Sequence, residues 1–192
     1  MKMSTKELVW AAMFTAIMCV ITIVIRLVPL FGVIPFSLLP FVMMLAAYLL
    51  SPRAVFLSLT AYLLLGLIGL PVFALPPYGG PGYVLIPSFG FLLGFPVAGW
   101  VQAKLLHQKS GNSLLRLVMA AVAAMLVYYA IGLPYIYMIL NFYMDRVVDV
   151  TQVLKIGFIP FVGFDLLKMT AAIFLAKELR ERLGVLRDVR VN

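Results

Sequence analysis

The sequence predicts an all-α integral membrane protein, built as a bundle of six transmembrane helices. Of its 192 residues, 65% are hydrophobic and only 11% are charged, and the mean hydropathy is +1.12. A water-soluble domain usually has about 45–50% apolar and about 25% charged residues. No polar stretch reaches the roughly 50 residues that a separate soluble domain requires. We therefore expect a single membrane domain over residues 1–192.

The positive charges predict how the helices are oriented in the membrane. When six helices are threaded through a bilayer, eleven of the fifteen Lys and Arg residues fall on one side. Cytoplasmic loops carry an excess of Lys and Arg, so both termini are expected in the cytoplasm. The same asymmetry explains the net charge of +8 without nucleic acid as a partner. The eleven are Lys2, Lys6, Arg53, Lys104, Lys109, Arg116, Lys177, Arg180, Arg182, Arg187 and Arg190.

The first three spans are predicted over residues 8–28, 36–50 and 54–70. About 20 apolar residues in a helix cross the roughly 30 Å of hydrocarbon in a bilayer, so the first span is of full length and the next two are short. Pro52 cannot continue a helix, which predicts a tight cytoplasmic turn between the second and third spans.

Small residues in the first span predict a surface on which another helix can dock. Ala12 and Ala16 form a small-xxx-small step, where two helices can approach closely. The motif alone is weak evidence, because two other pairs match it. These are Ala120/Ala124 and Ala172/Ala176.

The segment Gly69–Gly90, GLPVFALPPYGGPGYVLIPSFG, is too rich in proline and glycine to form a regular helix. It is also apolar and uncharged, and irregular backbone at membrane depth must be buried in protein or line a cavity. Two interpretations stay open: an outer connector, or a loop folded over a binding cavity, which we favour. Rings and flexible glycines suited to a cavity wall are Phe73, Tyr78, Gly79, Gly80, Gly82 and Tyr83.

The last three spans are predicted over residues 84–106, 114–139 and 156–177. In the fourth, Gly90 and Gly94 form a GxxxG step that favours tight helix packing. The fifth is expected to break near its Gly and Pro residues. Its tyrosines are expected in an aromatic belt at the membrane interface. These features are Gly132 and Pro134 for the break, and Tyr128, Tyr129, Tyr135 and Tyr137 for the belt.

Two opposite charges, Asp165 and Lys168, lie near the middle of the sixth predicted span. Each costs roughly 2.5–3.5 kcal/mol to insert at a helix centre, which marks them as functional candidates. At spacing i, i+3 they share one helix face. Either they form an ion pair that pins two helices, or they bind a polar ligand in an apolar cavity. We favour the second, with a ligand that carries both N–H donors and oxygen acceptors.

Several kinds of chemistry lack their motifs in this sequence. A GxxxxGK[ST] phosphate loop, an HExxH motif, a Cys/His cluster and a GxSxG elbow do not occur. We therefore expect no enzyme activity, no metal site and no cofactor. An intramembrane enzyme would need a second catalytic group beside Asp165. A purely structural membrane subunit is the other alternative from a different class.

The segment LLLGLIGLPVFALPPYGGPGYVLIPSFGFLLGFPVAGW (residues 63–100) carries a family resemblance, together with VIPFSLLPFVMMLAAYLLSPR (33–53), FDLLK (164–168) and the Ala12/Ala16 step. With these motifs the chain resembles the BioY family, the substrate-binding S components of biotin transporters of the energy-coupling factor (ECF) class. The resemblance implies a six-helix bundle in the bacterial cytoplasmic membrane, with a biotin cavity near its outer face.

The resemblance also implies roles and partners. Asp165 would accept from the ureido N–H groups of biotin, Lys168 would donate to one of its oxygens, and the loop from Phe73 to Tyr83 would be a lid and wall. Ala12 and Ala16 would meet a transmembrane scaffold subunit, and two cytoplasmic ATPase subunits would hydrolyse the ATP. An S component for another vitamin remains the alternative within this class.

Overall fold

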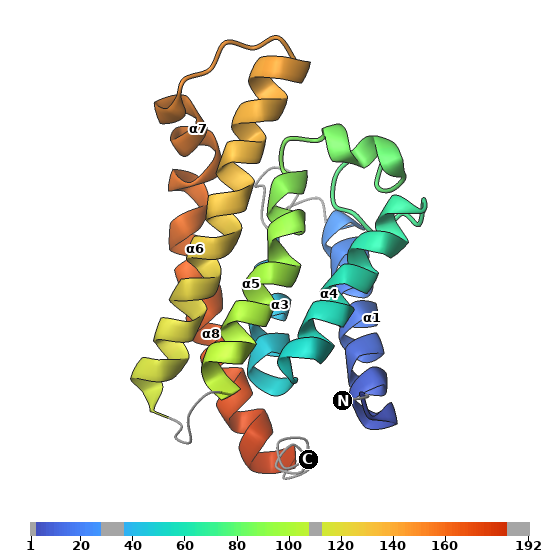
Figure 1. Ribbon diagram of the computed structural model, residues 1–192, viewed down its shortest axis with the longest axis vertical. Coiled ribbons are helices and arrows are strands. Elements are labelled where there is room, and N and C mark those ends of the chain that lie inside the picture. The colour runs from blue at the N-terminus through green and yellow to red at the C-terminus, as the bar shows by residue number, and fades with distance from the viewer. Residues whose placement is uncertain (1–2, 28–36, 108–112, 184–192) are drawn as a thin grey trace.

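The computed structural model describes residues 3–27, 37–107 and 113–183, and these residues form helices without any strand (Figure 1). Besides the seven α-helices there are a 3₁₀-helix at Pro81–Leu85 and a π-helical turn at Ile139–Tyr143. The α-helices are α1 (Thr5–Leu27), α3 (Leu39–Leu49), α4 (Pro52–Leu67), α5 (Phe89–His107), α6 (Leu114–Met138), α7 (Val150–Gly157) and α8 (Ile159–Leu183).

The helices pack in a bundle whose centre is the pair α5 and α6. Helix α4 packs on α5 and α1 packs on α4, while α3 contacts both α5 and α8. Figure 1 shows that α1 begins and α8 ends at the same end of the bundle, as an even number of crossings requires. The opposite end carries the α4–α5 loop (residues 68–88), and we refer to it as the loop end.

Glycines set the close contact between α5 and α6. A Cβ atom on Gly90 would lie 2.3 Å from Tyr135 Cβ, and one on Gly94 would lie 2.9 Å from Tyr128 Cα. The tight packing predicted from the GxxxG step is therefore confirmed. The expected break in the fifth span is wrong, because α6 runs past Pro134 to Met138. Gly132 serves packing instead, since a Cβ there would lie 2.3 Å from the Phe91 ring.

Among the residues that the structure describes, four helices are long and apolar enough to cross a membrane: Thr5–Leu27, Phe89–His107, Leu114–Tyr143 and Ile159–Leu179. The helices Leu39–Leu49 and Pro52–Leu67 are apolar but shorter. They correspond to the second and third predicted spans, which the sequence already made short. The chain is thus a multi-pass membrane protein, while the count of six spans and the cytoplasmic position of both termini stay predictions.

Most helix starts differ by a few residues from the predicted limits of the spans, and those of α5 and α8 have a clear structural reason. The 3₁₀-helix and a turn take up residues 84–88, so α5 begins at Phe89 rather than at residue 84. The sixth predicted segment is interrupted, because α7 ends at Gly157 and α8 begins at Ile159. Pro160 explains this break: a proline clashes with the carbonyl four residues earlier but is tolerated in the first turn of a helix.

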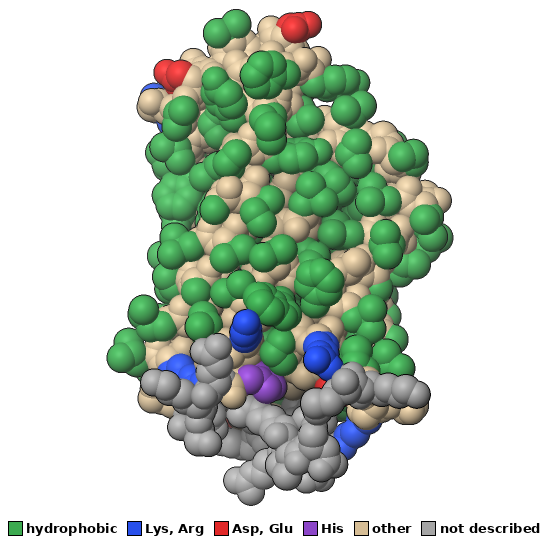
Figure 2. Space-filling model, in the orientation of Figure 1, with side chains coloured by type: hydrophobic (Ala, Val, Ile, Leu, Met, Phe, Trp, Pro, Cys, Tyr) green, Lys and Arg blue, Asp and Glu red, His purple; other side chains and the backbone are tan. Residues whose placement is uncertain are grey.

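Charge is distributed along the bundle as the orientation argument expects. On the face shown in Figure 2, most of the visible Lys and Arg side chains and the His side chain gather at the end opposite the loop end, while acidic side chains with a basic one beside them lie at the other extreme. Between them the surface is almost entirely hydrophobic. This apolar band is the surface that lipid tails would cover, and its basic end is the side predicted to face the cytoplasm.

Candidate functional site

Asp165 and Lys168 form a buried ion pair within α8. Their exposed fractions are 4% and 6%, and Lys168 Nζ donates to Asp165 Oδ1 over 2.8 Å. The spacing thus places both side chains on one helix face, as predicted. Because the two residues belong to the same helix, their ion pair does not itself join two helices. The charges face the protein interior, as intramembrane charges usually do.

Two tyrosines of α6 complete the environment of this carboxylate. Tyr128 and Tyr129 each donate a hydroxyl hydrogen to Asp165 Oδ2 over 2.7 Å. The pair of hydrogen bonds ties α6 to α8. Asp165 therefore accepts from three side chains, and hydrogen bonds to a charged acceptor are shorter and roughly twice as strong as neutral ones.

The sequence-based interpretation of these two tyrosines as interface residues is wrong. A belt residue is exposed at the membrane surface, whereas Tyr128 is 1% and Tyr129 is 6% exposed. Their position along the span, far from its end, was the signal that could have separated them from Tyr137, which is 37% exposed. Tyr128 lies more than two turns before the end of α6, at the level of Asp165, where a belt residue would not be.

Phenylalanine rings surround the polar centre. Phe91 and Phe95 of α5 and Phe158, between α7 and α8, make edge contacts with the two tyrosines at centroid distances of 4.9–6.4 Å. A few convergent polar groups inside aromatic walls are the usual composition of a small-molecule site. An ionised carboxylate has about four lone-pair positions, so three donors leave Asp165 room for one further hydrogen bond.

The α4–α5 loop has an aromatic core of its own. Phe73, Tyr83 and Phe89 are at most 2% exposed, and the rings of Phe73 and Tyr83 lie 4.3 Å apart. Phe73 packs onto α4 at Gly66, where a Cβ would come within 2.0 Å of the ring. This loop is therefore a folded cap rather than a loose connector. The two predicted wall residues Phe73 and Tyr83 lie inside that cap.

Two glycines of the loop allow its backbone to pack closely against the end of α4. Gly80 has a φ of +90° and donates its N–H to Gly66 O over 2.7 Å. A Cβ on Gly79 would meet Leu70 O at 2.3 Å, while the space beside Gly82 is open. Gly79 and Gly80 thus bring the loop backbone close to the C-terminal end of α4, while the place of these glycines in a cavity wall stays a prediction. Tyr78 is half-buried beside them.

Arg26 is a residue that the sequence analysis did not single out. It lies near the end of α1, and its Nη1 donates to Pro71 O over 3.2 Å and to Phe73 O over 3.5 Å. Its guanidinium also lies 4.3 Å from the ring centroid of Tyr78. A single Arg at a helix end gave no sequence signal of a loop contact, because the partners are backbone carbonyls about 45 residues away.

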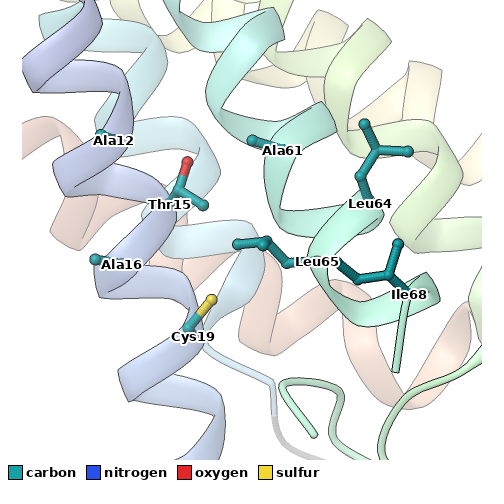
Figure 3. Close-up of a pocket in the computed structure, with 8 residues that line it drawn as sticks. All are labelled: Ala12, Thr15, Ala16, Cys19, Ala61, Leu64, Leu65 and Ile68. Atoms are coloured by element: carbon teal, nitrogen blue, oxygen red, sulfur yellow. The ribbon is translucent and has the colours of Figure 1, made fainter. Parts of the chain in front are cut away.

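A shallow apolar groove of about 480 Å³ runs between α1 and α4 (Figure 3). Ala12 and Ala16 lie on one of its walls, both exposed. The two other small-residue steps are buried inside the bundle. The groove is lined by Ala12, Thr15, Ala16, Cys19, Ala61, Leu64, Leu65 and Ile68.

Comparison with known proteins gives the family. The BioY family model matches residues 1–185. The biotin transporter BioY of Thermotoga maritima is 36% identical over 92% of this chain and 96% of its own length. A probable biotin transporter BioY of Lysinibacillus sphaericus is 33% identical, with 98% and 93% covered.

A solved structure confirms the fold. The crystal structure of the S-component for biotin from an ECF-type ABC transporter matches with a TM-score of 0.74. It is 21% identical in sequence, and the match covers 94% of this chain and 96% of that one. The all-helical S-component fold predicted from the sequence is therefore correct. With a family match over residues 1–185 and relatives above 30% identity along more than nine-tenths of its length, this chain belongs to the BioY family.

Proposed function

We propose that this chain is the biotin-binding S component of an ECF-type transporter, which binds biotin in the membrane and delivers it inward. It is a multi-pass protein of the bacterial membrane and not an enzyme. The observation that carries the proposal is the buried Asp165–Lys168 pair within aromatic walls, in a chain of the BioY family.

Asp165 and Lys168 are the proposed contacts to the polar end of biotin. The ureido ring of biotin carries two N–H donors and a carbonyl acceptor, and its side chain ends in a carboxylate. Asp165 is an acceptor with one lone-pair position still available, and Lys168 is a donor of up to three hydrogen bonds. We assign a ureido N–H group to Asp165 and an oxygen of biotin to Lys168. Tyr128 and Tyr129 hold the carboxylate in place.

The α4–α5 loop is the proposed lid and wall of the biotin cavity. Its folded core supports this role, because a cap with buried rings can close as a unit. Rings and glycine backbone are assigned to the wall on the strength of the family resemblance. The residues concerned are Phe73, Tyr78, Gly79, Gly80, Gly82 and Tyr83.

The partners of this chain are modules of an ECF transporter. We propose a transmembrane scaffold subunit, which docks at Ala12 and Ala16, and two cytoplasmic ATPase subunits that supply the energy. Exposure supports the docking site: of the three small-residue steps, the one at Ala12 and Ala16 is exposed and forms a groove. The chain itself uses no cofactor in this proposal.

Biotin binding to the detergent-purified chain, measured by calorimetry, tests the proposal. Wild type is expected to bind about one biotin per chain, and Lys168→Met is expected to bind at least tenfold more weakly, which corresponds to about 1.4 kcal/mol. Lys155→Met is the matched control, since Lys155 is exposed on α7 and should leave binding unchanged.

The other outcomes separate the alternatives. Unchanged binding by Lys168→Met would keep biotin as the ligand but remove its site from α8. Well-folded wild type that does not bind biotin, but is stabilised by thiamin or riboflavin, would make the chain an S component for another vitamin.

A further inference from the structure

Arg26 contacts both the start and the end of one turn in the α4–α5 loop. The turn is closed by two backbone hydrogen bonds, from Phe73 N to Tyr78 O (2.8 Å) and from Tyr78 N to Leu75 O (2.7 Å). Arg26 donates to the carbonyls of Pro71 and Phe73 at the start of this turn and stacks on the Tyr78 ring at its end. The planar guanidinium suits this double contact, which an ammonium could not reproduce.

The backbone of Tyr78 shows that something must hold the turn. Its φ of +68° lies in the left-handed region, which bulky residues rarely adopt. Such conformations persist only where the surrounding structure determines them. The Arg26 guanidinium over the ring, at 4.3 Å, is a contact from outside the loop that does so.

A second bridge joins α1 to the same turn through α4. Tyr62 donates its hydroxyl hydrogen to Val72 O over 2.9 Å and lies 3.3 Å from Thr22 Oγ1. Thr22 is one turn of α1 before Arg26, on the same face. The side chains of Thr22 and Tyr62 are buried, so this bridge is shielded from water. Helix α1 is therefore linked to the loop at two successive levels, directly through Arg26 and indirectly through Thr22 and Tyr62.

We propose that Arg26 is a positioning residue that holds the α4–α5 loop closed against α1, and thereby sets how fast the ligand leaves the site. The inference rests on the proposed function for its ligand, biotin. Arg26 acts through the loop and not on the ligand. Its loss should therefore open the loop locally while the bundle stays folded, and should change the dissociation rate more than the association rate.

The test compares Arg26→Met with wild type in two measurements on the full chain. Hydrogen exchange without ligand is expected to be at least tenfold faster in residues 70–80 of the variant, and unchanged in α3 and α5. Dissociation of labelled biotin is expected to be at least tenfold faster. Arg26→Lys keeps a positive charge near the Tyr78 ring but loses the planar guanidinium with its several donors. Its exchange and dissociation rates should therefore lie between those of wild type and Arg26→Met.

A matched control removes another arginine from the same end of the molecule. Arg146 is exposed in the α6–α7 connection, and Arg146→Met should match wild type in both measurements. If Arg26→Met does not fold, Tyr78→Ala removes the other half of the stacked pair, and it should speed hydrogen exchange in residues 70–80 to the same extent.

Three results would overturn the proposal. One is loop exchange in Arg26→Met equal to that of wild type. Another is faster exchange in all helices, which would make Arg26 a residue of general stability. The last is faster loop exchange with an unchanged dissociation rate, which would show that the loop does not control exit. If wild type binds no biotin, the proposed function fails, but the exchange measurement still decides whether Arg26 holds the loop.

Discussion

The polar centre and the loop cap are built in opposite ways. The polar centre, Asp165 with Lys168, Tyr128 and Tyr129, is fixed by three charge-assisted hydrogen bonds between side chains on two helices. The loop cap, residues 68–88, is fixed by packed rings, short backbone hydrogen bonds and glycine contacts. Side chains on helices are held more precisely than side chains on loops. The difference supports the proposal that the helices recognise the ligand and the cap controls its access.

Removal of the Asp165 carboxylate should have the largest effect, because it disrupts the polar centre and leaves the loop cap untouched. Asp165→Asn leaves Lys168 buried without its charged partner, and breaking a buried ion pair costs about 3–5 kcal/mol. We expect a marked fall in the midpoint of thermal unfolding and a loss of biotin binding of 100-fold or more by calorimetry. Glu178→Gln is the control, an exposed acid on the same helix. Retained binding in Asp165→Asn would remove the carboxylate from the site.

Removal of one tyrosine hydroxyl should have a smaller effect on the same centre. A hydrogen bond to a charged group contributes about 1.5–3 kcal/mol, so Tyr128→Phe or Tyr129→Phe should weaken binding by roughly 10- to 100-fold. Because both hydroxyls donate to Asp165 Oδ2, the double variant should lose less than the sum of the two. The exposed Tyr137→Phe should behave as wild type. Additive losses would show that the two tyrosines act independently.

A third change affects the cap and spares the polar centre. Gly66→Ala would place a Cβ 2.0 Å from Phe73 Cζ, and overpacking of this kind costs about 1–3 kcal/mol. We expect the ring to be expelled, chymotrypsin to cleave residues 68–88 faster, and α8 to stay protected. Gly82→Ala, where the space is open, is the matched control. Equal cleavage of the two variants would show that Phe73 does not anchor the cap.

The sequence predicts the charged half of the site better than the cap. Asp165 and Lys168 stand out because a charge inside an apolar span is costly wherever it lies. Tyr128 and Tyr129 do not stand out, because a tyrosine suits a membrane interface as well as a buried hydrogen bond. Their role depends on how α6 and α8 are aligned, because both tyrosines donate across that contact to Asp165, and no local pattern encodes this alignment.

The fold was predictable where single residues such as proline determine a helix end, and less predictable where tertiary packing determines the structure. Pro52 gave the turn before α4, and Ser51 caps that helix as expected of its position. Pro160 lies in the first turn of α8, but the apolar residues around it favoured one continuous helix over residues 156–177. The cap was recognised as an irregular buried segment. That the Phe73 ring packs onto Gly66 depends on tertiary packing alone.

The groove between α1 and α4 contains the single cysteine of the chain, Cys19. The protein thus carries its own chemical reporter at the surface proposed for the scaffold subunit. A small lipid-permeable thiol reagent would modify Cys19 in the isolated chain, and a subunit seated on the groove would shield it. Occupancy of the groove could then be followed in native membranes by mass spectrometry, without an engineered label.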